Sequence, residues 1–151
     1  MPPAANPLLS DAFVDFVLYD VLDVAALTAL PAFAEHSRDT FDATLGTYRR
    51  LARNALFPAY RSMDESPPAL VDGRVVTHPD MKRLWSLLCE AGVLSATRPA
   101  SVGGIDLPQS VGALATAYLM AANAAAYGFA GLTTGAAHLI EAFGDAAVRE
   151  L

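Results

Sequence analysis

The longest apolar stretch of the chain is residues 108–143, which read PQSVGALATAYLMAANAAAYGFAGLTTGAAHLIEAF. No charged residue precedes Glu141 in this stretch, so a single helix would be long enough to cross a membrane. The stretch is nevertheless rich in alanine and small polar residues, which favour membrane insertion much less than leucine or isoleucine does. Gly128 divides it into two helices of ordinary globular length. We therefore expect two buried helices of a helical bundle, over residues 108–126 and 128–143, and no membrane span.

A second helical pattern begins at Ser37 and predicts an amphipathic helix. We expect this helix to end close to Phe57, because Pro58 lacks the backbone donor that a helix interior needs. Residues 11–22 show a shorter pattern of the same kind. Apolar residues recur at helical intervals in the longer pattern: Phe41, Leu45, Tyr48, Leu51 and Leu56.

Proline and glycine mark the connections between the helices. Residues 62–79 are typical of a surface connection, in which Asp72-Gly73 predicts a hairpin turn between two short apolar pairs. Pro79 suits the first position of the next helix, and Gly92 is typical of the residue that follows a helix end. A loop with Gly103-Gly104 leads into the long apolar stretch. Together these patterns predict an all-α fold class.

The charged residues give no sign of a nucleic-acid interface. The net charge is −6, whereas phosphate binding needs a clustered basic surface. Arg49, Arg50 and Arg53 do gather, but acidic residues lie one or two turns away, so we expect a solvated helix face. Cys89 is the one cysteine, which excludes an internal disulfide, and we expect its thiol to be buried in an apolar run. The amino terminus lacks the basic and apolar regions of a secretory signal, so we expect a cytoplasmic protein.

Composition and spacing predict no catalytic residue and no metal site. His36, His78 and His138 are far apart in the sequence, and none has a neighbour at metal-ligand spacing. The sequence contains no Gly-x-Ser-x-Gly, Walker or Gly-x-Gly-x-x-Gly pattern. On these grounds alone the chain is a helical domain with a large buried or interfacial surface.

The order of short motifs in the second half of the chain is more specific. Glu90-Ala91-Gly92-Val93-Leu94 is followed by Pro99, by Val102-Gly103-Gly104 and by Leu107-Pro108, and residues 144–151 read GDAAVREL. This order resembles the amino-terminal signature of the acyl-CoA dehydrogenase family. The chain departs from the family pattern at four places: Val102, Asp106, Ala117-Tyr118 and Thr134.

The first half of the chain resembles one subgroup of that family, the long acyl-CoA dehydrogenases, which include the 3-methylmercaptopropionyl-CoA dehydrogenases. The resemblance implies the amino-terminal helical bundle of the acyl-CoA dehydrogenase fold over residues 37–151, with an extra amino-terminal helical segment over residues 1–36. The likeness to the subgroup is carried by four segments: DFVLYDVL (15–22), LPAFAE (30–35), DGRV (72–75) and PDMK (79–82).

The resemblance also implies the chemistry of a complete enzyme. Members of the family remove the α and β hydrogens of an acyl-CoA, with FAD as the hydride acceptor and a carboxylate as the base. The base lies in a carboxyl-terminal helical domain, and most flavin contacts come from that domain and from a flavin-binding β-domain. We expect both domains to lie outside these 151 residues, in cis or in trans, so no residue here is assigned as catalytic. The implied partners are an acyl-CoA substrate, FAD, the remaining domains, an electron-transfer acceptor and, in a homo-oligomer, further copies of the enzyme.

One predicted helix matches the wall of the acyl tunnel in that family. Glycine in such a wall lets a substrate chain or a neighbouring helix approach closely, and both interpretations are open. A function of another class is open as well, namely a non-catalytic helical interaction module or a membrane-associated one. The candidate tunnel residues recur on one side of the helix: Tyr127, Gly128, Gly131, Leu132 and Gly135.

Overall fold

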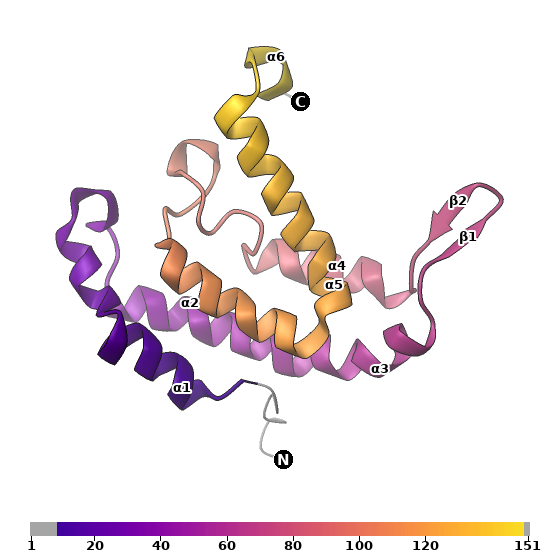
Figure 1. The fold of residues 1–151 in the computed structure, drawn as a ribbon, viewed down its shortest axis with the longest axis horizontal. Helices are drawn as coiled ribbons and strands as arrows, with labels where there is room; N and C mark the ends of the chain where they lie inside the picture. The colour runs from indigo at the N-terminus through magenta and orange to yellow at the C-terminus, as the bar shows by residue number, and fades with distance from the viewer. Residues whose placement is uncertain (1–8, 150–151) are drawn as a thin grey trace.

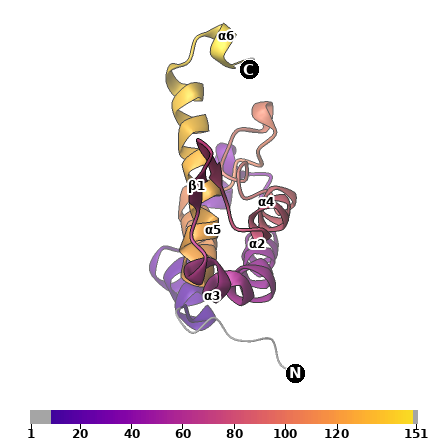
Figure 2. The same ribbon diagram turned by 90° about the vertical axis from the view of Figure 1, so that its right-hand side faces the viewer.

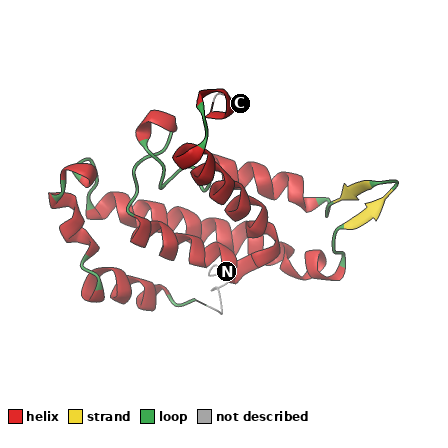
Figure 3. Cartoon of the chain, turned by 45° about the horizontal axis from the view of Figure 1, so that its top comes forward, coloured by secondary structure: helices red, strands yellow, loops and turns green. Residues whose placement is uncertain are grey.

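Helices form most of the structure, a computed structural model that describes residues 9–149 (Figure 1). The predicted all-α class is confirmed at this level, and the one sheet in the described part of the chain is a two-stranded hairpin (Figure 3). The elements in chain order are α1 (Asp11–Asp15), the π-helix η1 (Phe16–Val21), the 3₁₀ turns η2 (Val24–Ala29) and η3 (Pro31–Phe33), α2 (Arg38–Leu51), the π-helix η4 (Ala52–Leu56), α3 (Phe57–Glu65), β1 (Ala69–Val71), β2 (Arg74–Val76), α4 (Asp80–Glu90), the 3₁₀ turn η5 (Ala100–Val102), α5 (Gln109–Phe143) and α6 (Ala146–Arg149).

The helix α2 begins where the sequence predicts. The Ser37 hydroxyl accepts a hydrogen bond from the Thr40 amide (3.3 Å), and the Thr40 hydroxyl accepts one from the Ser37 amide (2.9 Å). This reciprocal pair satisfies two backbone donors that the first turn of a helix leaves free. The apolar residues of the pattern then form the buried face, with Phe41 and Leu45 almost fully covered.

The end of this helix differs from the prediction. The helical path continues through η4 and α3 to Glu65, so the predicted end near Phe57 and the start of a surface connection at residue 62 are wrong. In the wide turn of η4 the Phe57 amide donates to the Ala52 carbonyl, five residues earlier. Pro58 then falls in the first turn of α3, where a missing backbone donor costs little.

The Asp72-Gly73 turn and the helix end at Gly92 are both confirmed. Asp72 and Gly73 have φ angles of 49° and 74°, as a two-residue turn between antiparallel strands requires. Gly92 has a φ of 70°, and the Val93 amide donates to the Leu88 carbonyl (3.1 Å) to close α4. Leu88 is fully buried, but Cys89 is exposed, so the expectation of a buried thiol is wrong.

The helix α5 changes direction at Asn123, whose φ of −164° and ψ of 89° are not helical. We call residues 109–122 the first arm and residues 124–143 the second arm. The Asn123 Oδ1 accepts a hydrogen bond from the Ala126 amide (3.0 Å) and so caps the second arm. The predicted break at Gly128 is wrong. The helix breaks at Asn123, whose side chain caps the second arm, and Gly128 lies within that arm. No helix in the described range 9–149 is long and apolar enough to cross a membrane.

The core lies where the first arm of α5 packs on α2, η4, α3 and α4. Seen edge-on, α5 stands beside α2 and α4 (Figure 2). The second arm rises away from α2 and carries α6 at its far end (Figure 1). After Ala130, none of the described residues to 149 is fully buried. The largest fully buried side chains are Tyr48, Tyr118, Phe41, Leu18, Leu45, Leu56, Leu84, Leu88 and Leu119.

The segment before α2 belongs to the same core and is also held by ion pairs. Leu18 is fully buried. Asp11 accepts a hydrogen bond from Arg53 (2.6 Å), and Asp15 accepts one from Arg49 (2.7 Å). The Arg49 and Arg53 side chains are only 21% and 17% exposed, so the predicted solvated face is wrong for both. Their partners lie some forty residues away along the chain, which local spacing could not reveal.

Candidate functional site

The five predicted tunnel residues all lie on the second arm of α5, but their surroundings differ. Tyr127 packs against the core, whereas Leu132 is 79% exposed. A Cβ atom added at Gly128 or Gly135 would meet no other atom within 4 Å, and one at Gly131 would lie 3.0 Å from the Tyr127 ring. Gly128 and Gly135 therefore make no close contact within the described chain. Their surface is open to a ligand or another element, and the tunnel stays a prediction.

The loop between α4 and α5 lies in the angle between the two arms (Figure 1). Its Gly103-Gly104 pair has a steric role. Gly103 has a φ of 81°, and a Cβ atom at Gly104 would lie 1.9 Å from the Arg98 carbonyl oxygen. Asp106 closes the loop, since its Oδ2 accepts a hydrogen bond from the Ala100 amide (3.0 Å).

An ion pair ties this loop to the second arm. The guanidinium Nη2 of Arg98 contacts the Oε1 of Glu141, and their side chains are 13% and 25% exposed. Glu141 is the acidic residue near the end of the long apolar stretch, and its partner was not predicted from the sequence. The pair fixes the far part of the second arm relative to the loop.

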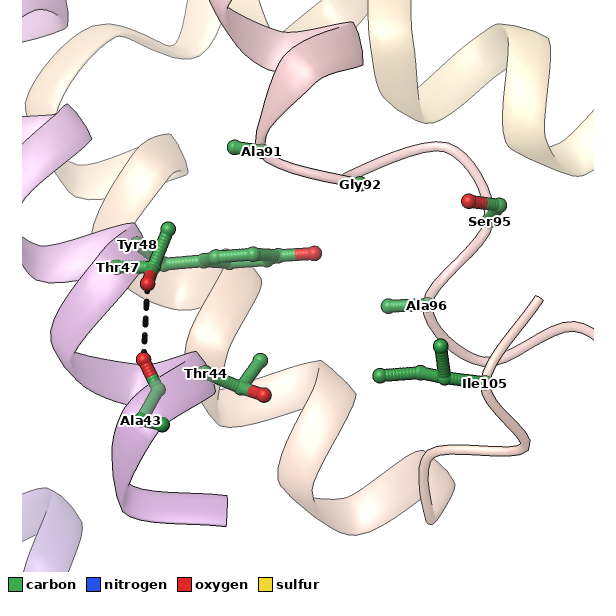
Figure 4. Close-up of a pocket in the computed structure, with 9 residues that line it drawn as sticks. All are labelled: Ala43, Thr44, Thr47, Tyr48, Ala91, Gly92, Ser95, Ala96 and Ile105. Atoms are coloured by element: carbon green, nitrogen blue, oxygen red, sulfur yellow. Dashed lines mark hydrogen bonds between the residues drawn. The ribbon is translucent and has the colours of Figure 1, made fainter. Parts of the chain in front are cut away.

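Two cavities meet at Tyr48, and Figure 4 shows the residues that line one of them. The larger cavity, of about 220 Å³, lies between α2 and the loop, and the smaller cavity, of about 140 Å³, lies between the loop and both arms of α5. Tyr48 and Ala96 line both of them. The larger cavity is also lined by Ala43, Thr44, Thr47, Gly92, Ser95 and Ile105, and the smaller one by Thr97, Gln109, Thr116, Tyr127, Thr134 and His138.

Tyr48 is the chemically distinctive residue of these cavities. Its side chain is only 2% exposed, although it lines both cavities. Burial, together with the nearby Tyr127, raises the pKa of Tyr48 to about 12, so the hydroxyl stays protonated at neutral pH. Sequence reasoning assigned Tyr48 only to the apolar face of α2. The sequence signal that could have drawn attention to it is a tyrosine in an apolar pattern otherwise made of phenylalanine and leucine.

The polar groups that line the two cavities are hydroxyls, the amide of Gln109 and the imidazole of His138. No three His, Cys, Asp or Glu side chains between residues 9 and 149 are placed to hold a metal ion. Among the described residues, no Lys, Arg, Asp or Glu lines either cavity at Tyr48. Comparison of the chain with models of protein families and with curated proteins finds no match.

Proposed function

We propose that the chain is the amino-terminal helical part of an FAD-dependent acyl-CoA dehydrogenase, and that it is not active alone. Two kinds of observation support this. The motifs around Gly92, Gly103-Gly104 and residues 144–151 follow the order of that family. The structure is helical around a core that the extra amino-terminal segment completes.

The observation that carries the proposal is the exposed apolar face of the second arm. Leu132, Leu139 and Phe143 are 79%, 62% and 82% exposed. Their spacing of seven and four residues places them on one side of the helix. An apolar face of this kind marks an interaction surface rather than a surface that faces water. In the proposed enzyme, the flavin-binding β-domain and the carboxyl-terminal helical domain cover it.

The chain would contribute a wall of the acyl tunnel rather than the reacting groups. Tyr127, Gly128, Gly131, Leu132 and Gly135 would orient the acyl chain along the second arm. FAD, when bound, accepts the hydride from the β carbon. The cavities at Tyr48 are smaller than the roughly 300 to 1,000 Å³ of sites for drug-sized ligands, so these residues do not form a flavin pocket by themselves. In the proposed enzyme, the flavin and the catalytic base belong to the other domains.

The proposal fixes the expected partners. They are the acyl-CoA substrate, the remaining acyl-CoA dehydrogenase domains in cis or in trans, and an electron-transfer acceptor. A homo-oligomer in the cytoplasm is the proposed working form.

The decisive test is the visible absorption spectrum of the protein purified from its own source, with whatever copurifies. We expect an oxidised-flavin spectrum that bleaches when an acyl-CoA is added. Leu132→Glu, which places a charge on the apolar face, should reduce the flavin retained. Leu70→Glu is the matched control, since Leu70 is 73% exposed on the hairpin, away from this face. A colourless protein that takes up no added FAD would contradict the proposal.

A second candidate is a non-catalytic helical interaction module, and the hairpin favours it. Leu70, Val71, Val75 and Val76 are each at least half exposed, so both strands present apolar side chains to solvent. On this alternative the preparation is colourless, and Leu70→Glu rather than Leu132→Glu disrupts its association with a partner. Preparations of Leu132→Glu and Leu70→Glu therefore distinguish the enzyme proposal from the interaction module.

A further inference from the structure

We propose that the hairpin β1–β2 of one copy of this chain docks in a groove between α4 and the second arm of α5 on a second copy, and that the two copies exchange hairpins in this way. Each hairpin presents an apolar face to the groove of the other copy, and a carboxylate at its turn meets a lysine at the groove. The proposal assigns a surface to contacts between copies, and it does not depend on the flavin enzyme assignment.

The groove is an open and mainly apolar surface of about 360 Å³ between α4 and the second arm. Met81 is 5% exposed, Trp85 packs partly against the core, and Phe129 is 40% exposed. The Thr133 hydroxyl donates to the Phe129 carbonyl (2.8 Å), so it needs no further partner. Lys82 is the one charged residue among the described residues that line the groove. Aromatic side chains that stay open to solvent in this way mark a protein interaction surface.

The register of the hairpin sorts its side chains into two faces. Leu70 lies directly opposite Val75, so these two side chains share one face. Val71 lies opposite Arg74, and this pair shares the other face. Leu70 and Val75 are 73% and 70% exposed, whereas Val71 is 50% exposed. Docking by the first face therefore covers the more exposed aliphatic pair and keeps the Arg74 guanidinium away from Lys82.

The charges of the hairpin turn and of the groove are complementary. Asp72 lies in the turn between the two strands, and Lys82 lies at the groove. Neither of them forms an ion pair with any residue in the described range 9–149. In the contact between copies the Asp72 carboxylate meets the Lys82 ammonium. Opposite charges across an interface fix its orientation, so this pair sets the direction in which the hairpin docks.

The position of the hairpin favours a second copy over the groove of its own chain. Figure 1 shows the turn of the hairpin pointing away from α4 and α5. Thr77 directly follows β2 and lines the groove, so hairpin and groove are neighbours on one side of the chain. A two-fold axis on this side places each hairpin in the groove of the other copy, and the assembly closes at two copies.

The test is the oligomeric state of the full 151-residue chain, measured by sedimentation velocity over a range of protein concentrations. We expect an equilibrium between monomer and dimer. Asp72→Lys and Lys82→Asp each bring like charges together and should each raise the dimer dissociation constant by roughly tenfold or more. An equimolar mixture of the two variants should form dimers again, because both contacts of the mixed pair join a lysine to an aspartate. A natural chain that stays monomeric would overturn the proposal.

Two further variants separate docking from folding. Arg83→Asp is the matched control for Lys82→Asp, since Arg83 is the next residue of α4, is exposed and does not line the groove; it should leave the dissociation constant unchanged. Asp72 has a φ of 49°, an angle that asparagine adopts more readily than lysine, so Asp72→Asn removes the charge and keeps the turn. It should weaken the dimer by roughly threefold to tenfold, because two exposed ion pairs are lost at once. Weaker dimers in Asp72→Asn support the contact even where lysine disturbs the turn, whereas unchanged dimers would show that the copies associate through another surface.

Discussion

The side-chain amide of Asn123 donates to the backbone carbonyl of Leu56 across the core, over 3.2 Å. The same Nδ2 lies 3.3 Å from the sulfur of Met63, while the Oδ1 caps the second arm of α5. Asn123 is 1% exposed, so water cannot replace these partners. The bend of α5 and the π turn η4 are therefore joined by one amide side chain.

We expect Asn123→Ala to lower the free energy of unfolding by about 2 to 3 kcal/mol. The substitution removes a helix cap and also removes the side-chain donor to the buried Leu56 carbonyl. Asn54→Ala is the control, because Asn54 is exposed on η4. Urea unfolding followed by circular dichroism measures both variants. Equal midpoints for the two would mean that the Asn123 bonds do not hold the bend.

Gly104→Ala should destabilise the fold by about 1 to 3 kcal/mol, as overpacking does. The new Cβ atom would lie 1.9 Å from the Arg98 carbonyl oxygen, so the loop backbone has to move. Gly135→Ala provides the opposite case, because a Cβ atom there meets no atom within 4 Å. It should raise stability by about 0.5 to 1 kcal/mol, since alanine is the better helix former. Thermal unfolding of the pair tests the sign of each effect.

Glu141→Gln should loosen the second arm more than the rest of the fold. The guanidinium of Arg98 is largely buried, and removing the charge of Glu141 leaves it without a counter-ion. This should lower the free energy of unfolding by about 1 to 2 kcal/mol. Amide hydrogen exchange should quicken in residues 131–143 and stay unchanged in α2. Uniform quickening across both helices would show that the ion pair supports global stability instead.

Part of the acid dependence of stability should come from Asp11. Burial alone would raise the pKa of Asp11, but hydrogen bonds from Arg53 and Tyr118 and the charge of Arg49 lower it overall from 3.8. A carboxyl with a lowered pKa stabilises the folded state above its ordinary pKa and loses that effect as the pH falls through its folded value.

We therefore expect the stability difference between the natural protein and Asp11→Asn to shrink as the pH falls through 3.8 and below it. The difference near neutral pH should be about 0.5 to 1 kcal/mol, since the Asp11 side chain is 37% exposed and is screened by solvent. Urea midpoints across this pH range measure it, with Asp64→Asn at an exposed position as the control. A constant difference would exclude a role for this titration.

Local signals in the sequence predicted local structure well. The Asp72-Gly73 turn and the Gly92 helix end need particular backbone angles, and only a few residue types adopt those angles readily. Pro58 misled the prediction because a proline is harmless in the first turn of a helix, and a wide π turn places it there. Gly128 was chosen as the break in the long apolar stretch because glycine has low helix propensity. Asn123, a preferred cap residue, was the stronger signal five positions earlier.

Contacts between distant residues were not available from the sequence. The pairing of Arg49 with Asp15, and of Arg98 with Glu141, joins residues that only the folded chain brings together. The hydroxyl of Tyr48 is a further example. Periodicity correctly assigned Tyr48 to the buried face, but it could not show that the surrounding elements leave two cavities beside the phenol ring. The candidate tunnel residues are on one helix, as expected, and their role stays a prediction.

The bend at Asn123 makes the second arm a lever. Its twenty residues extend about 30 Å at the rise of an α-helix, so a rotation of about 10° at its base displaces the far end by about 5 Å. The positions of the exposed residues Leu132, Leu139 and Phe143 therefore depend on the hydrogen bonds that Asn123 makes in the core, far from these residues. A substitution in the core at the bend can change what binds at the far end of the second arm, although every residue of that far end is unaltered.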